Sequence, residues 1–267
     1  MITIILRTLK NRRNIILAYS IIGILMLWMY VALFPSILEQ SAKIQSLMSA
    51  YPESLIKAFN IDATVFTQLE GFLAMEKYNI IWVILSTALL VGCGGSMIAG
   101  EIEKGTIETL LSQPISRIKI FVAKYISGVV ALLILILTTI PAAIIFANLY
   151  NIEHISQNYW TLSLVAFLFG ASIFSIAMFF SSIFSEKGKP YFLTTGIILI
   201  MYVLNIVSKI KDNLSDLKYI SFFHYYDPTL TLVDNKIDSL SFWVFGGTII
   251  IFTTLALIIF RKRDISV

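Results

Sequence analysis

The chain has 267 residues, of which 58% are hydrophobic and only 13% are charged. Soluble domains are about 45–50% apolar and about 25% charged, so a soluble fold of this size could not cover so much apolar surface. The acyl chains of a bilayer can cover it. The composition therefore predicts an integral membrane protein, and the single cysteine excludes an internal disulfide framework.

Six uncharged segments are close to the length of about 20 residues that a helix needs to cross about 30 Å of hydrocarbon. Their apolar runs are continuous rather than alternating, which favours helices over a barrel. The expected fold is an all-α membrane protein forming one transmembrane domain over residues 1–267. Pro141, inside the third segment, predicts a kink. The predicted spans are 15–34, 80–99, 126–147, 160–184, 191–207 and 242–260.

The distribution of Lys and Arg predicts the orientation of the chain. Cytoplasmic loops of membrane proteins carry an excess of these residues, and placing both termini inside puts most of the 20 on the inner side. We therefore expect a multi-pass protein of the cell membrane with cytoplasmic termini and no nucleic-acid partner. The inner basic residues are Arg7, Lys10, Arg12, Arg13, Lys104, Arg117, Lys119, Lys124, Lys187, Lys189, Arg261, Lys262 and Arg263.

The first 14 residues have the pattern of an amphipathic helix, with apolar residues on one face and basic residues around the other. Such a helix can lie in the plane of the membrane against anionic lipid headgroups. A basic end that only fixes the topology is an equally good interpretation. The basic residues are Arg7, Lys10, Arg12 and Arg13.

Two outer segments, 35–77 and 209–240, are predicted to form short helices on the outer surface. The second contains an aromatic cluster with the character of a re-entrant or interfacial element, made of Phe222, Phe223, His224, Tyr225, Tyr226, Asp227 and Pro228. We expect no metal site there, because the other histidine, His154, lies on a different outer loop and no cysteine supports it.

Small residues recur every four positions along the second span, at Ala88, Gly92, Ser96 and Gly100. This stripe predicts a close approach of another helix. A phosphate-binding loop is a poorer interpretation, because no Lys-Ser or Lys-Thr follows the glycines.

The segment after the second span, 100–124, is the densest charge cluster near the membrane on the predicted inner side. Thr106 is a candidate N-cap, Glu108 falls in the first helical turn and Pro114 ends the helix. Ser116 can cap the helix that follows. The sequence therefore predicts a short amphipathic helix lying across the inner face, with an apolar face made of Ile107, Leu110 and Leu111.

The run E-x-E-x-G-T-x-E-x-L-L-S-x-P-x-S-R, followed by a lysine, resembles the signature of the ABC type-2 transporter permeases. The matching residues are Glu101, Glu103, Gly105, Thr106, Glu108, Leu110, Leu111, Ser112, Pro114, Ser116, Arg117 and Lys124. Six spans, an amphipathic N-terminal helix and a long first outer loop also resemble that family.

The resemblance implies the membrane half of an exporter. Two permease subunits, identical or different, would pair above two ATPase subunits, and the helix after span two would be the coupling element. ATP and Mg²⁺ would be held by the partner ATPase, and this chain would bind no cofactor. The chain has no G-x-x-x-x-G-K-[ST] motif, so we do not expect it to be an enzyme.

No ionisable residue falls inside the six predicted spans. Ion-coupled carriers usually need one, so a secondary transporter is the weaker alternative. The same absence favours an apolar or amphipathic cargo such as a lipid, a hydrophobic peptide or a drug. A non-transporting immunity or regulatory subunit with the same fold stays open.

Overall fold

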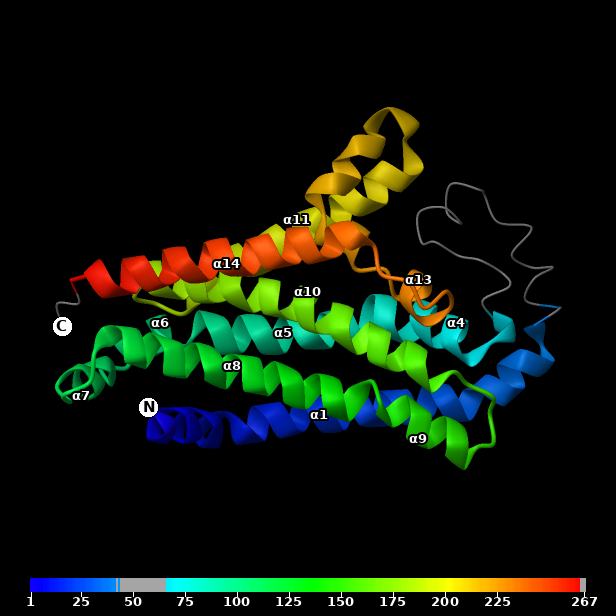
Figure 1. Ribbon diagram of the computed structural model, residues 1–267, viewed down its shortest axis with the longest axis horizontal. Helices are drawn as coiled ribbons and strands as arrows, with labels where there is room; N and C mark the ends of the chain where they lie inside the picture. Colours follow the sequence, from blue (N-terminus) through cyan, green and yellow to red (C-terminus); the bar gives the residue numbers. More distant parts are fainter. Residues whose placement is uncertain (42, 44–65, 265–267) are drawn as a thin grey trace.

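The computed structural model describes residues 1–41, 43 and 66–264. All regular secondary structure in this part of the chain is helical, and the long helices run side by side (Figure 1). Six helical segments of the described residues are long and apolar enough to cross a membrane. These observations confirm an all-α membrane protein.

The six long segments overlap the six predicted spans in the predicted order, although the second and fourth segments end before the predicted spans do. They are α1 (Ile2–Glu39), the run Leu69–Gly95, the run Arg117–Leu149, α10 (Ser156–Ile183), α11 (Gly188–Ile210) and α14 (Ser239–Lys262). The second is built from α4 (Leu69–Leu73), the π-helix η2 (Ala74–Ile81) and α5 (Trp82–Gly95), and the third from α8 (Arg117–Thr139) and α9 (Ala142–Leu149). The shorter elements are α6 (Ala99–Glu103), α7 (Ile107–Leu111), η3 (Asp212–Ile220), α12 (Phe222–Tyr225) and α13 (Pro228–Leu232).

The N-terminal segment is helical, but it is not a separate element. It continues without a break into the first span, so that α1 has 38 residues and a length of about 57 Å. No Gly or Pro separates the basic turns from the apolar span in 1–22, and these are the residues that usually interrupt a helix. The expectation of a distinct in-plane helix is therefore corrected.

The central helix is α10, which packs against α5, α8, α11 and α14. Close packing with α8 depends on Gly128, where a Cβ atom would lie 1.9 Å from Cζ of Phe174. Near the middle of α10, the ring of Phe169 stacks on Tyr226 with 4.6 Å between centroids. The core of the molecule is thus a seam of side chains along α10.

The second span differs most from its prediction. The helical run begins at Leu69 and ends at Gly95, rather than covering 80–99, so it includes Lys77. This side chain is fully buried, and its Nζ donates to the carbonyl oxygens of Gly23, at 3.2 Å, and Thr139, at 3.3 Å. The expectation that the spans hold no ionisable residue is therefore wrong for this helix.

The predicted kink at Pro141 is confirmed, since α8 ends at Thr139 and α9 begins at Ala142. The break redirects the N–H of Ala143 to Ile140, which leaves the carbonyl of Thr139 without its helical partner. Lys77 Nζ and the Tyr78 hydroxyl, at 3.4 Å, donate to that carbonyl instead. Buried backbone carbonyls need such partners, so the break in one span explains the lysine in another.

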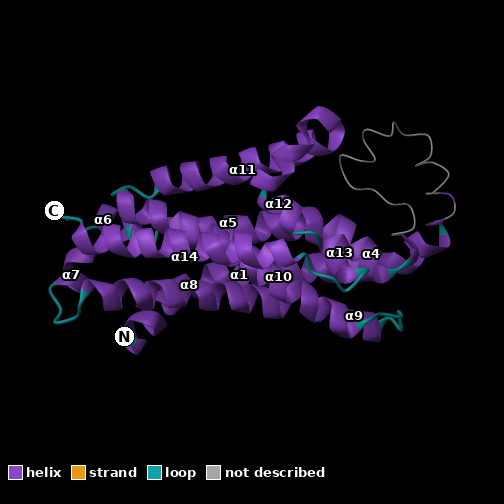
Figure 2. Ribbon diagram, turned by 45° about the horizontal axis from the view of Figure 1, so that its top comes forward, coloured by secondary structure: helices purple, strands orange, loops and turns teal. Residues whose placement is uncertain are grey.

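The two ends of the bundle carry different elements. The N-terminus, the end of α14, α6 and α7 lie at one end, whereas α4, α9 and α13 lie at the other, as both ribbon views show (Figures 1 and 2). The short helices predicted for 209–240 are confirmed as η3, α12 and α13. The short helices expected in 35–77 fall mostly on 44–65, which lie outside the described residues.

Candidate functional site

The charged segment after span two folds into two short helices joined by a tight turn. Gly105, between α6 and α7, has φ +67°, a left-handed conformation that is unfavourable for residues with a Cβ atom. Its N–H donates to the carbonyl of Ile102 at 3.0 Å. The glycine therefore sets the angle at which α7 leaves α6.

The predicted helix exists as α7, but its capping differs from the prediction. Thr106 makes no side-chain cap, and its hydroxyl donates to the carbonyl of Glu101 at 3.3 Å. Ile107 is fully buried, whereas Leu110 and Leu111 are half-buried against the core. The opposite face of α7 carries Glu108, which is exposed.

Glu101 connects α6 to α8. Its Oε1 lies 2.5 Å from Nζ of Lys124, and the lysine side chain is only 1% exposed while that of Glu101 is 28% exposed. A buried ammonium needs such a partner, because removing an ion from water costs several kcal/mol. Two residues of the motif are thus brought together although 22 intervening positions separate them in the sequence.

Glu103 connects α6 to the loop before α11. Its Oε2 accepts a hydrogen bond from the backbone N–H of Lys187 at 2.9 Å, and its Oε1 lies 3.4 Å from Nζ of the same residue. The backbone hydrogen bond from Lys187 is the main cause that lowers the pKa of this carboxyl below its ordinary value. Lys187 was assigned only a topological role by the sequence, and spacing alone could not place it here.

Arg117 binds the end of α14 rather than α7. Its guanidinium donates to the carbonyl oxygens of Phe260, at 3.4 Å, and Arg263. Arg263 in turn donates to the carbonyls of Ser182 and Phe184, both at 3.0 Å. The last carbonyls of a helix lack partners within it, so the two arginines join the ends of α8, α10 and α14.

Ser181 stabilises the break between α5 and α6. Its fully buried hydroxyl accepts from the N–H groups of Ile98 and Ala99, both at 3.0 Å, and donates to the carbonyl of Gly95 at 2.9 Å. This serine on α10 therefore satisfies three backbone groups that the break leaves without helical partners. A serine within an apolar span was visible in the sequence, but its partners were not.

A cavity of about 920 Å³ lies between the first turns of α1, the end of α5 and α7. Ala88, Gly92, Ser96 and Gly100 all line it, so the small-residue stripe faces open space rather than a helix. A Cβ atom on Gly92 would meet nothing within 4 Å, whereas one on Gly95 would lie 2.6 Å from Tyr191. The predicted close approach is corrected accordingly.

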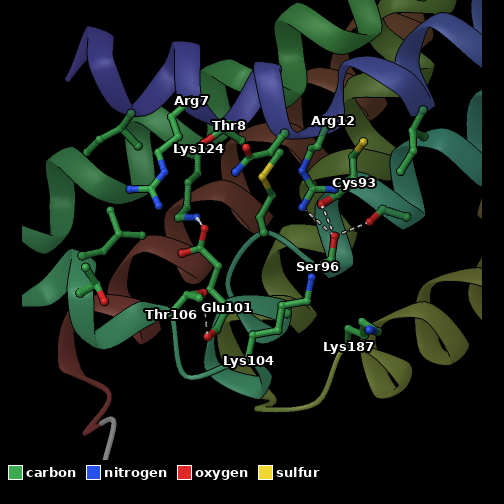
Figure 3. Close-up of a pocket in the computed structure, with 18 of the residues that line it drawn as sticks. Arg7, Thr8, Arg12, Cys93, Ser96, Glu101, Lys104, Thr106, Lys124 and Lys187 are labelled. Atoms are coloured by element: carbon green, nitrogen blue, oxygen red, sulfur yellow. Dashed lines mark hydrogen bonds and ion pairs between the residues drawn. The ribbon is translucent and has the colours of Figure 1, made fainter.

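The four N-terminal basic residues divide into two pairs. Arg7 and Arg12 line the cavity with Glu101, Thr106, Leu110 and Lys124, whereas Lys10 and Arg13 do not. Arg12 donates to the hydroxyl of Ser96 at 2.7 Å, and both arginines extend from α1 into the cavity (Figure 3). The remaining motif residues on the α7 side, Glu108, Leu111, Ser112 and Pro114, are not among its walls.

The predicted outer cluster lies at the other end of the bundle from α7. Tyr226 is buried, and its hydroxyl donates to the carbonyl of Tyr78 at 3.2 Å. Asp227 caps α13 by accepting from the N–H groups of Thr229, at 2.9 Å, and Leu230, at 3.0 Å. Phe222, Phe223 and Tyr225 are also buried, Pro228 is the first residue of α13 and His224 is half-buried, its pKa lowered mainly by burial.

These contacts give the outer cluster a packing role in this fold. Within the described ranges, no group of three or more His, Cys, Asp or Glu side chains converges.

Comparison with known proteins adds independent information. A family described as ABC-2 family transporter protein matches residues 8–265. The chain is also similar to a protein named ABC transporter permease protein NatB from Bacillus subtilis (strain 168). The two are 24% identical over 227 residues, which cover 78% of this chain and 58% of that relative. This chain therefore spans less than two thirds of the length of the relative.

Proposed function

Because this chain belongs to the ABC-2 family of transporter proteins, we propose that it is a permease subunit whose α7 receives the force of a separate ATPase. The single observation that carries the proposal is the arrangement of α6 and α7. Their inner faces are fixed to three spans, and their outer face presents a carboxylate with no partner among the described residues.

Polar contacts to neighbouring spans hold α6 and, through it, α7. Glu101 joins α6 to Lys124 on α8, and Ser181 on α10 holds the break between α5 and α6. A displacement of α7 therefore cannot be absorbed locally, because the polar contacts at both ends of α6 connect it to neighbouring spans.

The side chain of Glu108 is exposed, and it forms no ion pair or hydrogen bond with any residue in the described part of the chain. Glu101 and Glu103, by contrast, are both engaged within the chain. Of the three motif carboxylates, Glu108 is thus the one that is free to bind a basic side chain of a partner.

In the proposed mechanism, closure of two ATPase subunits pushes α7 through Glu108. The push passes through α6 to α5, α8 and α10, and the paired permease subunits change between inward and outward access as rigid bodies. Both termini and α7 would then be cytoplasmic, in agreement with their position at one end of the bundle (Figure 1). The second permease subunit is either a copy of this chain or a related one.

A lipid, a hydrophobic peptide or a drug-like molecule is the proposed cargo class. The buried Lys77 removes one argument for an apolar cargo and against an ion-coupled carrier. It makes its contacts with two backbone carbonyls, however, and not with an acidic side chain. Lys77 thus donates to backbone carbonyls, one of which is freed by the helix break. The proposal of an ABC transporter rests on the family match.

The test uses the chain co-expressed with a candidate ABC ATPase subunit from the same organism, reconstituted in lipid nanodiscs. We expect Glu108→Lys to lower permease-dependent ATP turnover at least about tenfold, because the substitution places like charges against the basic partner surface. Gly105→Ala should lower it less, since alanine strains the turn that aims α7.

Glu186→Lys is the matched control, because Glu186 is a 67% exposed carboxylate on the neighbouring loop. Its turnover should stay within about twofold of the wild type, as is usual for substitutions on an exposed surface. Equal turnover in all variants would remove α7 from the mechanism. Failure to purify with any ATPase would instead favour the immunity or regulatory alternative.

A further inference from the structure

The cavity beside α7 has an excess of positive charge. Arg7, Arg12, Lys104, Lys124 and Lys187 line it, and Glu101 is the one acidic residue among its described walls. Glu101 already neutralises Lys124 and Glu103 pairs with Lys187, so that three cationic side chains, Arg7, Arg12 and Lys104, face the space without a carboxylate partner among the described residues. Such an excess in a partly apolar site attracts an anion strongly, because the local dielectric constant is lower than that of water.

Two of these cations are positioned by the same helix. Arg7 and Arg12 both come from the first turns of α1 and extend into the cavity (Figure 3). Arg12 is held by its hydrogen bond to Ser96, whereas Arg7 has no hydrogen bond or ion pair with another described residue. A planar guanidinium presents donors in a fixed fork that fits the oxygens of a phosphate. The cavity therefore holds one guanidinium group, of Arg12, that is fixed by a hydrogen bond and one, of Arg7, that is free to bind a ligand.

The opposite wall is built to leave space. Ala88, Gly92 and Ser96 present almost no side-chain volume from α5, and Gly92 has no neighbouring atom within 4 Å of a Cβ position. Glycine in a helix interior costs about 1 kcal/mol relative to alanine, and here no packing contact offsets that cost. Open space of this kind is consistent with a ligand site.

The walls also contain apolar side chains, among them Ile4, Ile15, Leu89 and Met97. The volume of about 920 Å³ is in the range of about 300–1,000 Å³ typical of ligand pockets. Basic pockets between membrane helices bind anionic lipid headgroups. A ligand with an anionic head and an apolar body fits both kinds of wall.

At the base of the cavity, Glu101 presents an unused acceptor. Its Oε1 contacts Lys124, but its Oε2 is buried without a hydrogen-bond partner in the structure. Buried acceptors are rarely left in this state. The oxygen has almost no accessible surface, so a ligand hydroxyl group would satisfy it only after the Glu101 carboxylate rotates toward the cavity.

We propose that this cavity is a binding site for a phosphate-bearing anion, held by the forks of Arg7 and Arg12 against the small-residue wall of α5. An anionic phospholipid with a hydroxylated headgroup, such as phosphatidylglycerol, has the matching chemistry, and a soluble phosphate compound shares its head. The proposal concerns binding by this chain alone and does not depend on the ATPase-driven function.

The first experiment titrates the purified full-length chain in detergent with phosphatidylglycerol and counts bound lipid by native mass spectrometry. The double variant Arg7→Gln with Arg12→Gln should bind at least about tenfold more weakly than the wild type, because it loses two charge-assisted contacts. Phosphatidylcholine, whose head has no net charge, should bind the wild type at least about tenfold more weakly than phosphatidylglycerol.

The matched control is Lys10→Gln with Arg13→Gln. It removes the same charge from the same helix, but neither residue lines the cavity. Its affinity for phosphatidylglycerol should remain within about twofold of the wild type, since exposed charges separated from a ligand are screened by salt. Equal losses in the two double variants would overturn the proposal in favour of a general attraction of the basic helix to anionic surfaces.

A second variant tests the space rather than the charge. Gly92→Leu places a side chain where nothing lies within 4 Å, so it fills the cavity and improves helix propensity. We expect it to fold normally and to lose phosphatidylglycerol binding. Gly196→Leu, at an equally open glycine of α11 that does not line the cavity, should bind as the wild type does.

The last arm identifies the source of the anion. Inorganic phosphate is added in competition with the lipid. If inorganic phosphate displaces phosphatidylglycerol at an equal concentration, the ligand is a soluble phosphate compound. If at least about a hundredfold excess of phosphate is needed, the acyl chains contribute to binding and the ligand is a lipid. A wild-type chain that binds neither probe, or a Gly92→Leu variant that binds as well as the wild type, overturns the site and leaves the proposed function untouched.

Discussion

The middle of the helix bundle and its α7 end are stabilised in different ways. In the middle, Phe169, Tyr226 and Trp82 form a continuous stack, and even Lys77 is enclosed by backbone carbonyls. At the α7 end, helices are joined by ion pairs and by arginines on carbonyl oxygens, and a large cavity lies between them. Close packing dominates the middle, and directional polar contacts dominate the α7 end.

This difference indicates which region can change shape. Packed rings have one good arrangement, because protein interiors are as dense as organic crystals. Polar contacts beside an open cavity can exchange partners without creating a void. We therefore expect substitutions in the middle of the bundle to act on stability and those at the α7 end to act chiefly on coupling and binding.

The largest expected effect comes from Phe169→Ala. The substitution removes a fully buried ring that stacks on Tyr226, and such truncations cost about 3–5 kcal/mol. Thermal unfolding in detergent micelles measures the loss. Phe192→Ala is the control, because that ring is 78% exposed on α11, and a loss as large in the control would mean that the aromatic stack is not specially packed.

The next effect comes from Glu101→Gln, which leaves Lys124 buried beside a neutral partner. Breaking a buried pair costs about 3–5 kcal/mol, and we expect about 3 kcal/mol here because the glutamate is 28% exposed. Glu186→Gln, in an exposed pair, should change stability by about 0.5 kcal/mol or less. If the two variants unfold at the same temperature, the ion pair between Glu101 and Lys124 contributes nothing to the fold.

A smaller effect is expected from Ser181→Ala. It leaves the buried N–H groups of Ile98 and Ala99 without their acceptor, at a cost of about 1–3 kcal/mol. The neighbouring Ser182→Ala is a close control, because its hydroxyl bonds only to the carbonyl of Met178 in its own helix. Chemical denaturation of both variants should separate them, and equal midpoints would contradict the role of Ser181 at the break.

The smallest effect is a dependence on acid. Folding lowers the pKa of Glu103 from its ordinary value of 4.5, so the contact with Lys187 is fully present above that pH. It is lost as the pH falls below about 4.5 and through the folded pKa. We expect the wild type to lose stability against unfolding in that pH range and the Glu103→Gln variant to lose less. Identical pH profiles of unfolding would contradict the contact.

The sequence was sufficient to predict the elements whose signal is local. Continuous apolar runs predicted six spans, Pro141 predicted a break, and the motif predicted α7 and its end near Pro114. Ser116 caps α8 as predicted, by accepting from the N–H of Lys119 at 3.4 Å. Each of these features depends on residues within a few positions of one another.

The errors arose where a distant partner decides the outcome. The charges at Glu76 and Lys77 moved the predicted start of span two to Ile80, but the helix begins at Leu69 because Lys77 finds acceptors on two other spans. Likewise, spacing showed that Ala88, Gly92 and Ser96 share a face, but not whether that face meets a helix or a cavity. Sequence periodicity defines a face without identifying its neighbour.

The unbroken α1 makes its N-terminal turns sensitive to bilayer thickness. Residues 15–34 of α1 are about 30 Å long, the thickness of a hydrocarbon layer, and the 13 residues before Asn14 add about 20 Å. Along the helix axis, Arg12 and Arg7 lie about 5 Å and about 12 Å beyond Ile15, so a hydrocarbon layer that ends at Ile15 would leave both guanidinium groups among the lipid headgroups. A thicker or thinner membrane would tilt or shift this rod and carry both guanidinium groups with it.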